Sequence, residues 1–156
     1  MNDQTFLRQA LELAREGSLA SEAGPFGAVV VRGEEVVGRG WNQVVKNRDP
    51  TAHAEVMAIR DAGDRLETHV LDDCIIYCSC EPCPMCLSAI YWSRIPRVVF
   101  AASAEDARAA GFDDALIAGE MGLEWDDRTL QSRQALREEG KEVLEEWTRD
   151  PDRIQY

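Results

Sequence analysis

Apolar positions predict a helix and then a β-hairpin in the first part of the chain. From Asp3 to Glu16 they recur at helical spacing, and Gly17 follows as a stop signal, so we expect an amphipathic helix packed on another layer. Two β-rich runs come next, at 27–31 and 35–41, and the turn between them contains a glycine. This arrangement is typical of a hairpin.

Helical and strand patterns alternate through the middle of the chain. We expect strands at 74–78 and 97–102, and helices at 54–66, from Met85 to Trp92 and at 103–110. This order predicts an α/β fold in which helices cover both faces of a sheet. The pattern is ambiguous at 129–147, which has the propensity for one helix although Gly140 and its charged neighbours interrupt the apolar stripe.

Length and charge narrow the class of protein. A chain of 156 residues, 45% of them hydrophobic, is expected to form one domain spanning 1–156. Its 29 acidic and 17 basic side chains give a net charge of −12, which repels a phosphate backbone and disfavours a nucleic-acid partner. Neither a membrane-spanning run nor a secretory signal is found in the sequence, so we expect a cytoplasmic protein with no membrane partner.

The candidate chemistry lies in His53-Ala54-Glu55 and in Pro82-Cys83-Pro84-Met85-Cys86. This H-x-E and P-C-x-x-C pattern is the signature of zinc deaminases. Two thiolates three residues apart at a helix start lie on one face and can share a tetrahedral ion, and His53 adds a third ligand. The fourth position is left for water, whose proton Glu55 is placed to receive and return.

The cysteines allow other interpretations. All five lie between Cys74 and Cys86, where disulfides would only link one short segment to itself, so metal binding is the better interpretation. A closed four-thiolate site or an iron–sulfur cluster on Cys78, Cys80, Cys83 and Cys86 is an alternative. Cys74, Cys78 and Cys80 are expected instead to be small buried apolar residues.

Five sequence blocks carry a resemblance to a known family. They are Gly24 to Val29, Asp49 to Glu55, Ser79 to Cys86, Ala89 to Trp92 and Ala110 to Asp114. At these blocks the chain resembles the cytidine deaminase superfamily, and over nearly its whole length it is similar to the bacterial guanine deaminase branch. The resemblance implies a three-layer α/β/α sandwich around a mixed five-stranded sheet. It places the last strand near 129–136 and a final helix around 142–147.

The resemblance also implies an activity and an assembly. The activity is hydrolysis of guanine to xanthine and ammonia with one Zn²⁺ per subunit. The assembly is a homodimer in which the C-terminal segment is exchanged between subunits. Other substrates stay open, namely guanosine, a cytosine-type base, an amino-triazine or a tRNA adenosine, as does a zinc-stabilised binding module without catalysis.

Substrate contacts come from the resemblance alone. It implies that Asn42 binds the base edge, that Phe26 and His53 enclose the ring, and that Asp114 and Tyr156 contact the polar side of the purine. Ala54 and Trp92 complete the implied substrate-binding set. Each contact has a structural alternative: Asn42 could cap a strand end, Phe26 could belong to the core, Asp113 or Asp114 could cap the following helix, and Tyr156 could be frayed.

Overall fold

The computed structural model describes residues 2–19 and 23–156. The chain divides into two compact units, residues 1–118 and 119–156, with the boundary inside helix α6 (Ala115–Glu120). No helix within the described ranges is long and apolar enough to cross a membrane. The first unit contains the sheet.

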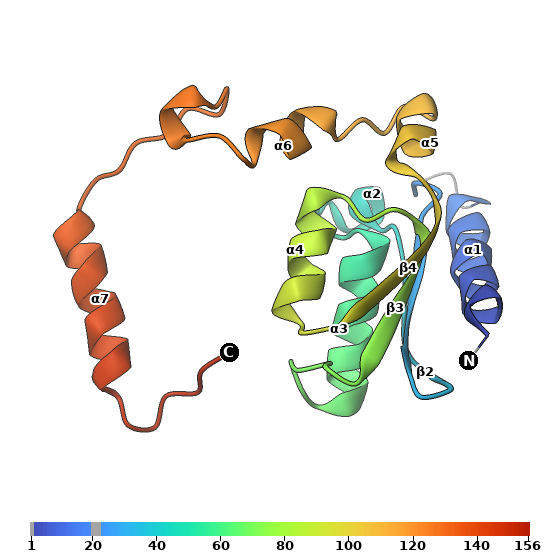
Figure 1. Ribbon diagram of the computed structural model, residues 1–156, viewed down its shortest axis with the longest axis horizontal. Helices are drawn as coiled ribbons and strands as arrows, with labels where there is room; N and C mark the ends of the chain where they lie inside the picture. The colour runs from blue at the N-terminus through green and yellow to red at the C-terminus, as the bar shows by residue number, and fades with distance from the viewer. Residues whose placement is uncertain (1, 20–22) are drawn as a thin grey trace. The chain divides into compact units, whose positions relative to one another are not determined.

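A four-stranded mixed sheet forms the centre of the first unit, in the order β2-β1-β3-β4 (Figure 1). The strands are β1 (Gly27–Arg32), β2 (Glu35–Trp41), β3 (Cys74–Cys80) and β4 (Arg97–Ala102). β1 pairs antiparallel with β2 and with β3, whereas β3 pairs parallel with β4. β4 is an edge strand, and its Phe100 is 45% exposed.

Helices cover the two faces of this sheet and so make three layers (Figure 1). Helix α1 (Asp3–Leu19) packs Phe6 against Val29, Val31 and the Tyr77 ring on one face. On the opposite face of the sheet, helices α3 (Ala54–Leu66) and α4 (Pro84–Trp92) form a second core with the alternate β1 residues Ala28 and Val30. Successive β1 residues face opposite sides of the sheet, and helices cover both sides. β1 is therefore buried on both faces and consists almost wholly of small and β-branched residues.

A glycine lets α3 approach the sheet closely at its first turn. A β-carbon at Gly40 would lie 2.1 Å from the Ala54 carbonyl oxygen and 2.4 Å from the Ala58 nitrogen. Any side chain at Gly40 would therefore push the start of α3 away from β2. This close contact sets the position of the first turn of α3 relative to β2. His53 and Glu55 lie at that turn.

Short helices follow the sheet strands. α2 (Val44–Asn47) follows β2, and α5 (Ala104–Ala109) follows β4. α5 begins with a capping box, in which Ser103 and Asp106 each accept the backbone amide of the other.

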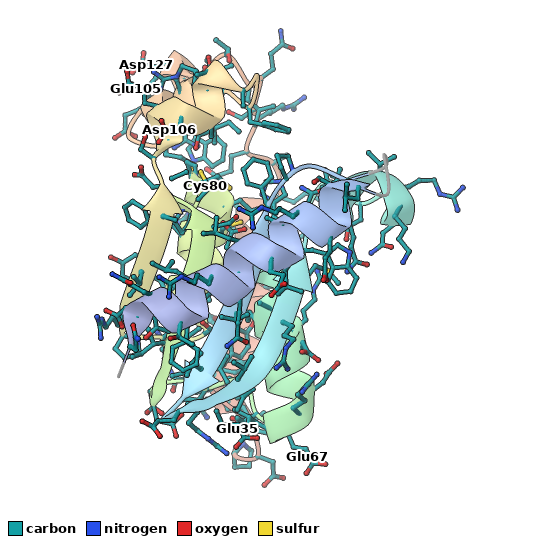
Figure 2. The ribbon with its side chains drawn as sticks, turned by 90° about the vertical axis from the view of Figure 1, so that its right-hand side faces the viewer. Glu35, Glu67, Cys80, Glu105, Asp106 and Asp127 are labelled. Atoms are coloured by element: carbon teal, nitrogen blue, oxygen red, sulfur yellow. The ribbon has the colours of Figure 1, made fainter. Side chains whose placement is uncertain are left out.

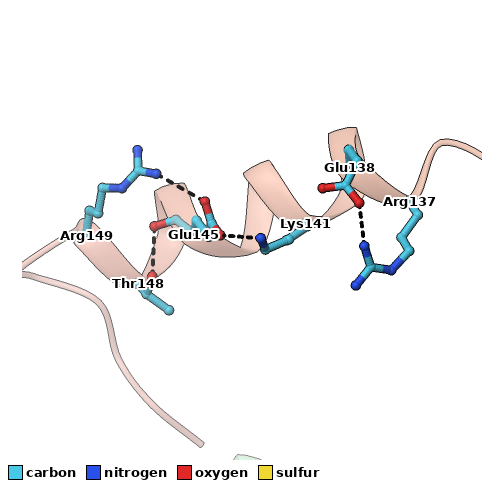
Figure 3. A network of polar contacts seen from close by, with 6 residues as sticks. All are labelled: Arg137, Glu138, Lys141, Glu145, Thr148 and Arg149. Atoms are coloured by element: carbon cyan, nitrogen blue, oxygen red, sulfur yellow. Dashed lines mark hydrogen bonds and ion pairs between the residues drawn. The ribbon is translucent and has the colours of Figure 1, made fainter.

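The second unit contains η1 (Trp125–Asp127) and α7 (Arg137–Arg149). Ion pairs line one side of α7, joining Glu145 to Lys141 and to Arg149, and Arg137 to Glu138 (Figure 3). Apolar residues on α7 are exposed, with Val143 at 65% and Leu144 at 68%. None of residues 119–156 is buried, so the second unit has no core of its own.

The structure corrects the expected sheet. It has four strands and not five, because residues 129–136 form no strand. A strand is stabilised by the open edge of a neighbour, and this segment belongs to the unit that contains no sheet. The helix expected around 142–147 is present and longer, at 137–149.

Candidate metal centre and active site

Two helix starts bring the predicted metal ligands together. His53 is the N-cap residue of α3 and Cys83 the N-cap residue of α4. Pro84 occupies the first turn of α4, where its missing N–H costs nothing. Cys86 lies in the same turn and is buried. The ligands are thus held by the backbone of two helices packed against the same sheet face.

The spacing of the donor atoms fits a tetrahedral zinc ion. His53 Nδ1 lies 3.6 Å from Cys83 Sγ and 3.5 Å from Cys86 Sγ, and all three donor atoms lie within 4.8 Å of one another. Ordinary Zn–N and Zn–S bonds at a tetrahedral angle separate N and S by about 3.6 Å. These three residues could therefore hold a zinc ion through three protein ligands.

The four-thiolate alternative finds no support in the described part of the chain. His53, Cys83 and Cys86 are the group found there that could hold a metal. Cys78 is buried in the α3 core, and Cys80 directs its thiol to the Ser103 carbonyl oxygen at 3.5 Å. Cys78 and Cys80 lie two residues apart on β3, on the same face of the sheet, and neither belongs to this group.

The ligands polarise one another even without a cation. The Cys83 thiol has its pKa lowered to about 4, first because Cys86 hydrogen-bonds to it and then because His53 does. The His53 pKa is raised, chiefly by the same bond to Cys83. The Cys86 pKa is raised, first by its interaction with the Cys83 sulfur and then by burial. Cys83 is therefore the thiolate that forms most readily, the form that binds metal.

Glu55 is a buried carboxyl group beside this centre. It is 7% exposed and lies in the first turn of α3, where its Oε2 accepts the Cys86 thiol at 3.3 Å. Burial raises the pKa of Glu55, because desolvation penalises the carboxylate. A carboxyl group that can hold a proton beside a metal-activated water is what general acid–base catalysis requires.

A cavity of about 480 Å³ opens onto this centre. Six of the predicted site residues line it, namely Phe26, Asn42, His53, Glu55, Cys83 and Asp114. Ala54 does not, because it is fully buried in the core beneath α3. Trp92 lies at the end of α4, 63% exposed, and is absent from the described cavity lining. Tyr156 belongs to the second unit and is 74% exposed.

Hydrogen bonds fix the orientation of the Asn42 amide. Its Oδ1 accepts the backbone N–H groups of Gly24 at 3.4 Å and of Val44 at 3.3 Å. The oxygen is thereby engaged, and the NH₂ group is left to serve a ligand in the cavity. Asn42 thus presents a hydrogen-bond donor to whatever the cavity binds.

Two neighbouring aspartates have different surroundings. Asp113 accepts the Ala115 amide at 2.9 Å and the Arg108 guanidinium at 3.2 Å, and its pKa is lowered, first by the Ala115 amide. Asp113 therefore caps α6. The Asp114 side chain has no hydrogen bond or ion pair to the described residues, so its carboxylate is the one left to accept from a ligand.

Several lining residues were missed from the sequence. They are apolar or lie on loops, namely Val44, Val45, Pro50, Met85, Ala104, Ala107, Phe112 and Ile117. Phe112 meets Phe26 edge to face, with ring centroids 4.8 Å apart. The one local signal was Gly111, which adopts a positive φ of 96° and turns the chain toward Phe112. The other contacts depend on tertiary packing.

Comparison with known proteins gives matches over the whole chain. The family model of the cytidine and deoxycytidylate deaminase zinc-binding region matches residues 1–102. Guanine deaminase of Bacillus subtilis is 46% identical over 156 residues and covers 100% of both chains. Its crystal structure superposes with a TM-score of 0.96 over 100% of this chain and 99% of that chain.

A more distant match is a tRNA-specific adenosine deaminase of Buchnera aphidicola. It is 39% identical over 110 residues, which cover 70% of this chain and 72% of that protein. The match over residues 1–102 and the full-length similarity both include the His53, Cys83 and Cys86 group. The chain therefore belongs to the zinc-binding cytidine and deoxycytidylate deaminase family, within its guanine deaminase branch.

Proposed function

We propose that this protein hydrolyses guanine to xanthine and ammonia. The observation that carries the proposal is the buried carboxyl of Glu55 beside a three-ligand zinc site that opens onto a cavity. Full-length similarity to guanine deaminase supports guanine over other bases. The wider family leaves the substrate open, since it includes adenosine deaminases of tRNA.

His53, Cys83 and Cys86 would hold the zinc ion, which when bound lowers the pKa of a water molecule and so supplies the nucleophile. Glu55 accepts the proton that this water loses. It delivers that proton to the ring nitrogen next to the attacked carbon, then accepts the proton of the hydroxyl now bonded to that carbon and passes it to the exocyclic nitrogen. A C–O bond forms, the C–N bond to the amine breaks, and ammonia leaves.

The other cavity residues bind and orient the substrate. Phe26 and His53 enclose the planar ring, Asn42 donates through its NH₂ group, and Asp114 accepts from ring or amino N–H groups. The fixed amide of Asn42 and the unengaged carboxylate of Asp114 support this assignment. Substrate contacts by Ala54, Trp92 and Tyr156 stay predictions.

The proposal includes a homodimer in which residues 119–156 of each subunit complete the other, so that each subunit forms one deaminase domain. Two features support it. Residues 119–156 have no buried side chain, and exposed apolar residues lie on α7. The edge strand β4 is half exposed around Phe100. We also propose a cytoplasmic location, where the thiol ligands stay reduced.

Ammonia release by the purified protein tests the substrate. Guanine, guanosine, cytosine, adenosine and an amino-triazine are assayed with and without a chelator. Turnover of guanine that is lost on chelation is the expected result. Turnover of another compound would overturn the substrate, and zinc binding with no turnover would favour a non-catalytic binding module. Filter binding of tRNA at low salt, expected to be negative at a net charge of −12, tests the tRNA alternative.

A further inference from the structure

Glu81 joins the loop that carries Cys83 to the segment that follows β4. Its backbone N–H donates to the Ala102 carbonyl oxygen at 2.8 Å, and its Oε2 accepts the Ala104 amide at 2.9 Å. The adjacent Cys80 thiol reaches the Ser103 carbonyl oxygen. In Figure 2, Cys80 lies directly below α5, which carries Glu105 and Asp106. Polar contacts therefore fasten the start of α5 to the metal loop.

Beyond that point the segment 103–115 is bonded mainly to itself. The Ser103 capping box closes its first turn, and the Phe112 amide donates to the Ala107 carbonyl oxygen at 2.9 Å. Asp113 then accepts from Arg108 and from the first amide of α6. The segment is thus a small internally bonded unit that carries Phe112 and Asp114 to the cavity. Its position depends on how its start is held and on the edge-to-face contact of Phe112 with Phe26.

We propose that Glu81 is a positioning residue for the substrate cavity. It acts through the Ala104 amide to hold Phe112 and Asp114 in place relative to the metal centre. The inference rests on the proposed function. Glu81 serves as an acceptor for an otherwise free amide at the start of α5, supplied by another part of the chain. Because its carboxylate is exposed, water replaces the bond when it is lost. The effect is therefore on placement more than on folding.

The substitutions Glu81→Ala and Glu81→Gln test this, with Glu105→Ala as the matched control. Glu105 is the next acidic residue, in the first turn of α5. Glu81 lines the cavity and Glu105 does not, so the exchange signal over residues 103–115 is the readout that identifies positioning. Glu81→Ala should raise amide hydrogen exchange over residues 103–115 and raise KM for guanine, with kcat/KM falling roughly ten- to a hundredfold. Zinc content should stay at the level of the unsubstituted protein. Glu81→Gln keeps an acceptor oxygen and should restore most of both signals.

The outcomes separate the inference from the proposed function. If the unsubstituted protein does not deaminate guanine, the proposed function fails, and exchange over 103–115 still decides the role of Glu81. Unchanged exchange in Glu81→Ala would overturn the inference. So would an equal defect in Glu81→Gln, which would point to the charge, or an equal defect in Glu105→Ala, which would point to general loosening of α5.

Discussion

At the residue scale, the carboxyl of Glu55 is the group on which the chemistry depends. Glu55→Gln keeps the shape of the side chain and removes its ability to take a proton. We expect guanine turnover to fall by at least roughly 10² to 10⁴, the usual contribution of general acid–base catalysis, while zinc stays bound. Ammonia release and metal content of the same sample measure both. Retained turnover would contradict the assigned role.

Tyr77 links the centre of the sheet to the start of α1. It is buried, and its hydroxyl donates to Asp3 Oδ1 at 2.9 Å, while Arg97 reaches the other Asp3 oxygen at 2.6 Å. Burial, with the bond to Asp3, raises the pKa of Tyr77 to about 12. The folded protein therefore holds this proton more tightly than the unfolded chain. The resulting stabilisation is present below about pH 10 and is lost as the pH rises toward 12.

Tyr77→Phe tests this link. It should lower the free energy of unfolding near neutral pH by about 1 to 3 kcal/mol, because a bond to a charged group is removed. It should also flatten the fall in stability between about pH 10 and 12. Urea unfolding at several pH values measures both effects. Tyr91→Phe, at a ring 72% exposed, is the control and should leave the slope unchanged.

The residues that belong to short motifs could be predicted from the sequence. The cavity-lining residues that depend on tertiary packing could not. His53, Cys83 and Cys86 converge because two motifs each start a helix. Phe112 and Val44 reach the same cavity from segments whose approach to it no local pattern encodes. The resemblance assigned Asp114 to the substrate but left either Asp113 or Asp114 as the cap of the following helix, and the structure shows Asp113 capping α6.

At the element scale, the approach of α3 to β2 depends on Gly40. Gly40→Ala would place a methyl group against the Ala54 and Ala58 backbone, and we expect a loss of about 1 to 3 kcal/mol in unfolding free energy. Thermal or urea unfolding measures it. Zinc affinity should fall as well, since His53 starts this helix. Gly119→Ala, which meets nothing within 4 Å, is the control and should be neutral or stabilising; a similar loss there would contradict the argument.

Elements of the first unit were predicted closely because each has a strong pattern and a partner within the chain. The helix at 54–66 was predicted with the bounds observed, and the β4 strand likewise. Residues 129–136 were expected to form a strand from the resemblance, against a weak and polar pattern of their own. The described chain offers them no strand partner, and the fifth strand is absent.

At the scale of the whole molecule, exchange of residues 119–156 between subunits predicts complementation. One chain carries Glu55→Gln, and the other ends at Asp150 and so lacks Tyr156. Each alone should be nearly inactive. Refolded together, random pairing should restore about one quarter of the sites, because each mixed dimer holds one intact core facing one intact tail.

The control is each chain refolded with itself. Activity that stays absent in the mixture would contradict the exchange, since a tail acting on its own subunit leaves no chain with both parts intact. Full activity of the shortened chain alone would instead remove Tyr156 from the site. Ammonia release from guanine reads out every combination.

The two N-cap positions set a limit on how far this fold could be stabilised. His53 and Cys83 occupy N-cap positions, where Ser, Thr, Asp or Asn bond first-turn amides more strongly and add about 1 kcal/mol of stability each. Selection for thermal endurance alone would favour those residues and would erase the zinc ligands. Variants of this protein selected for a high melting temperature measured without metal should therefore gain stability and lose zinc binding and activity.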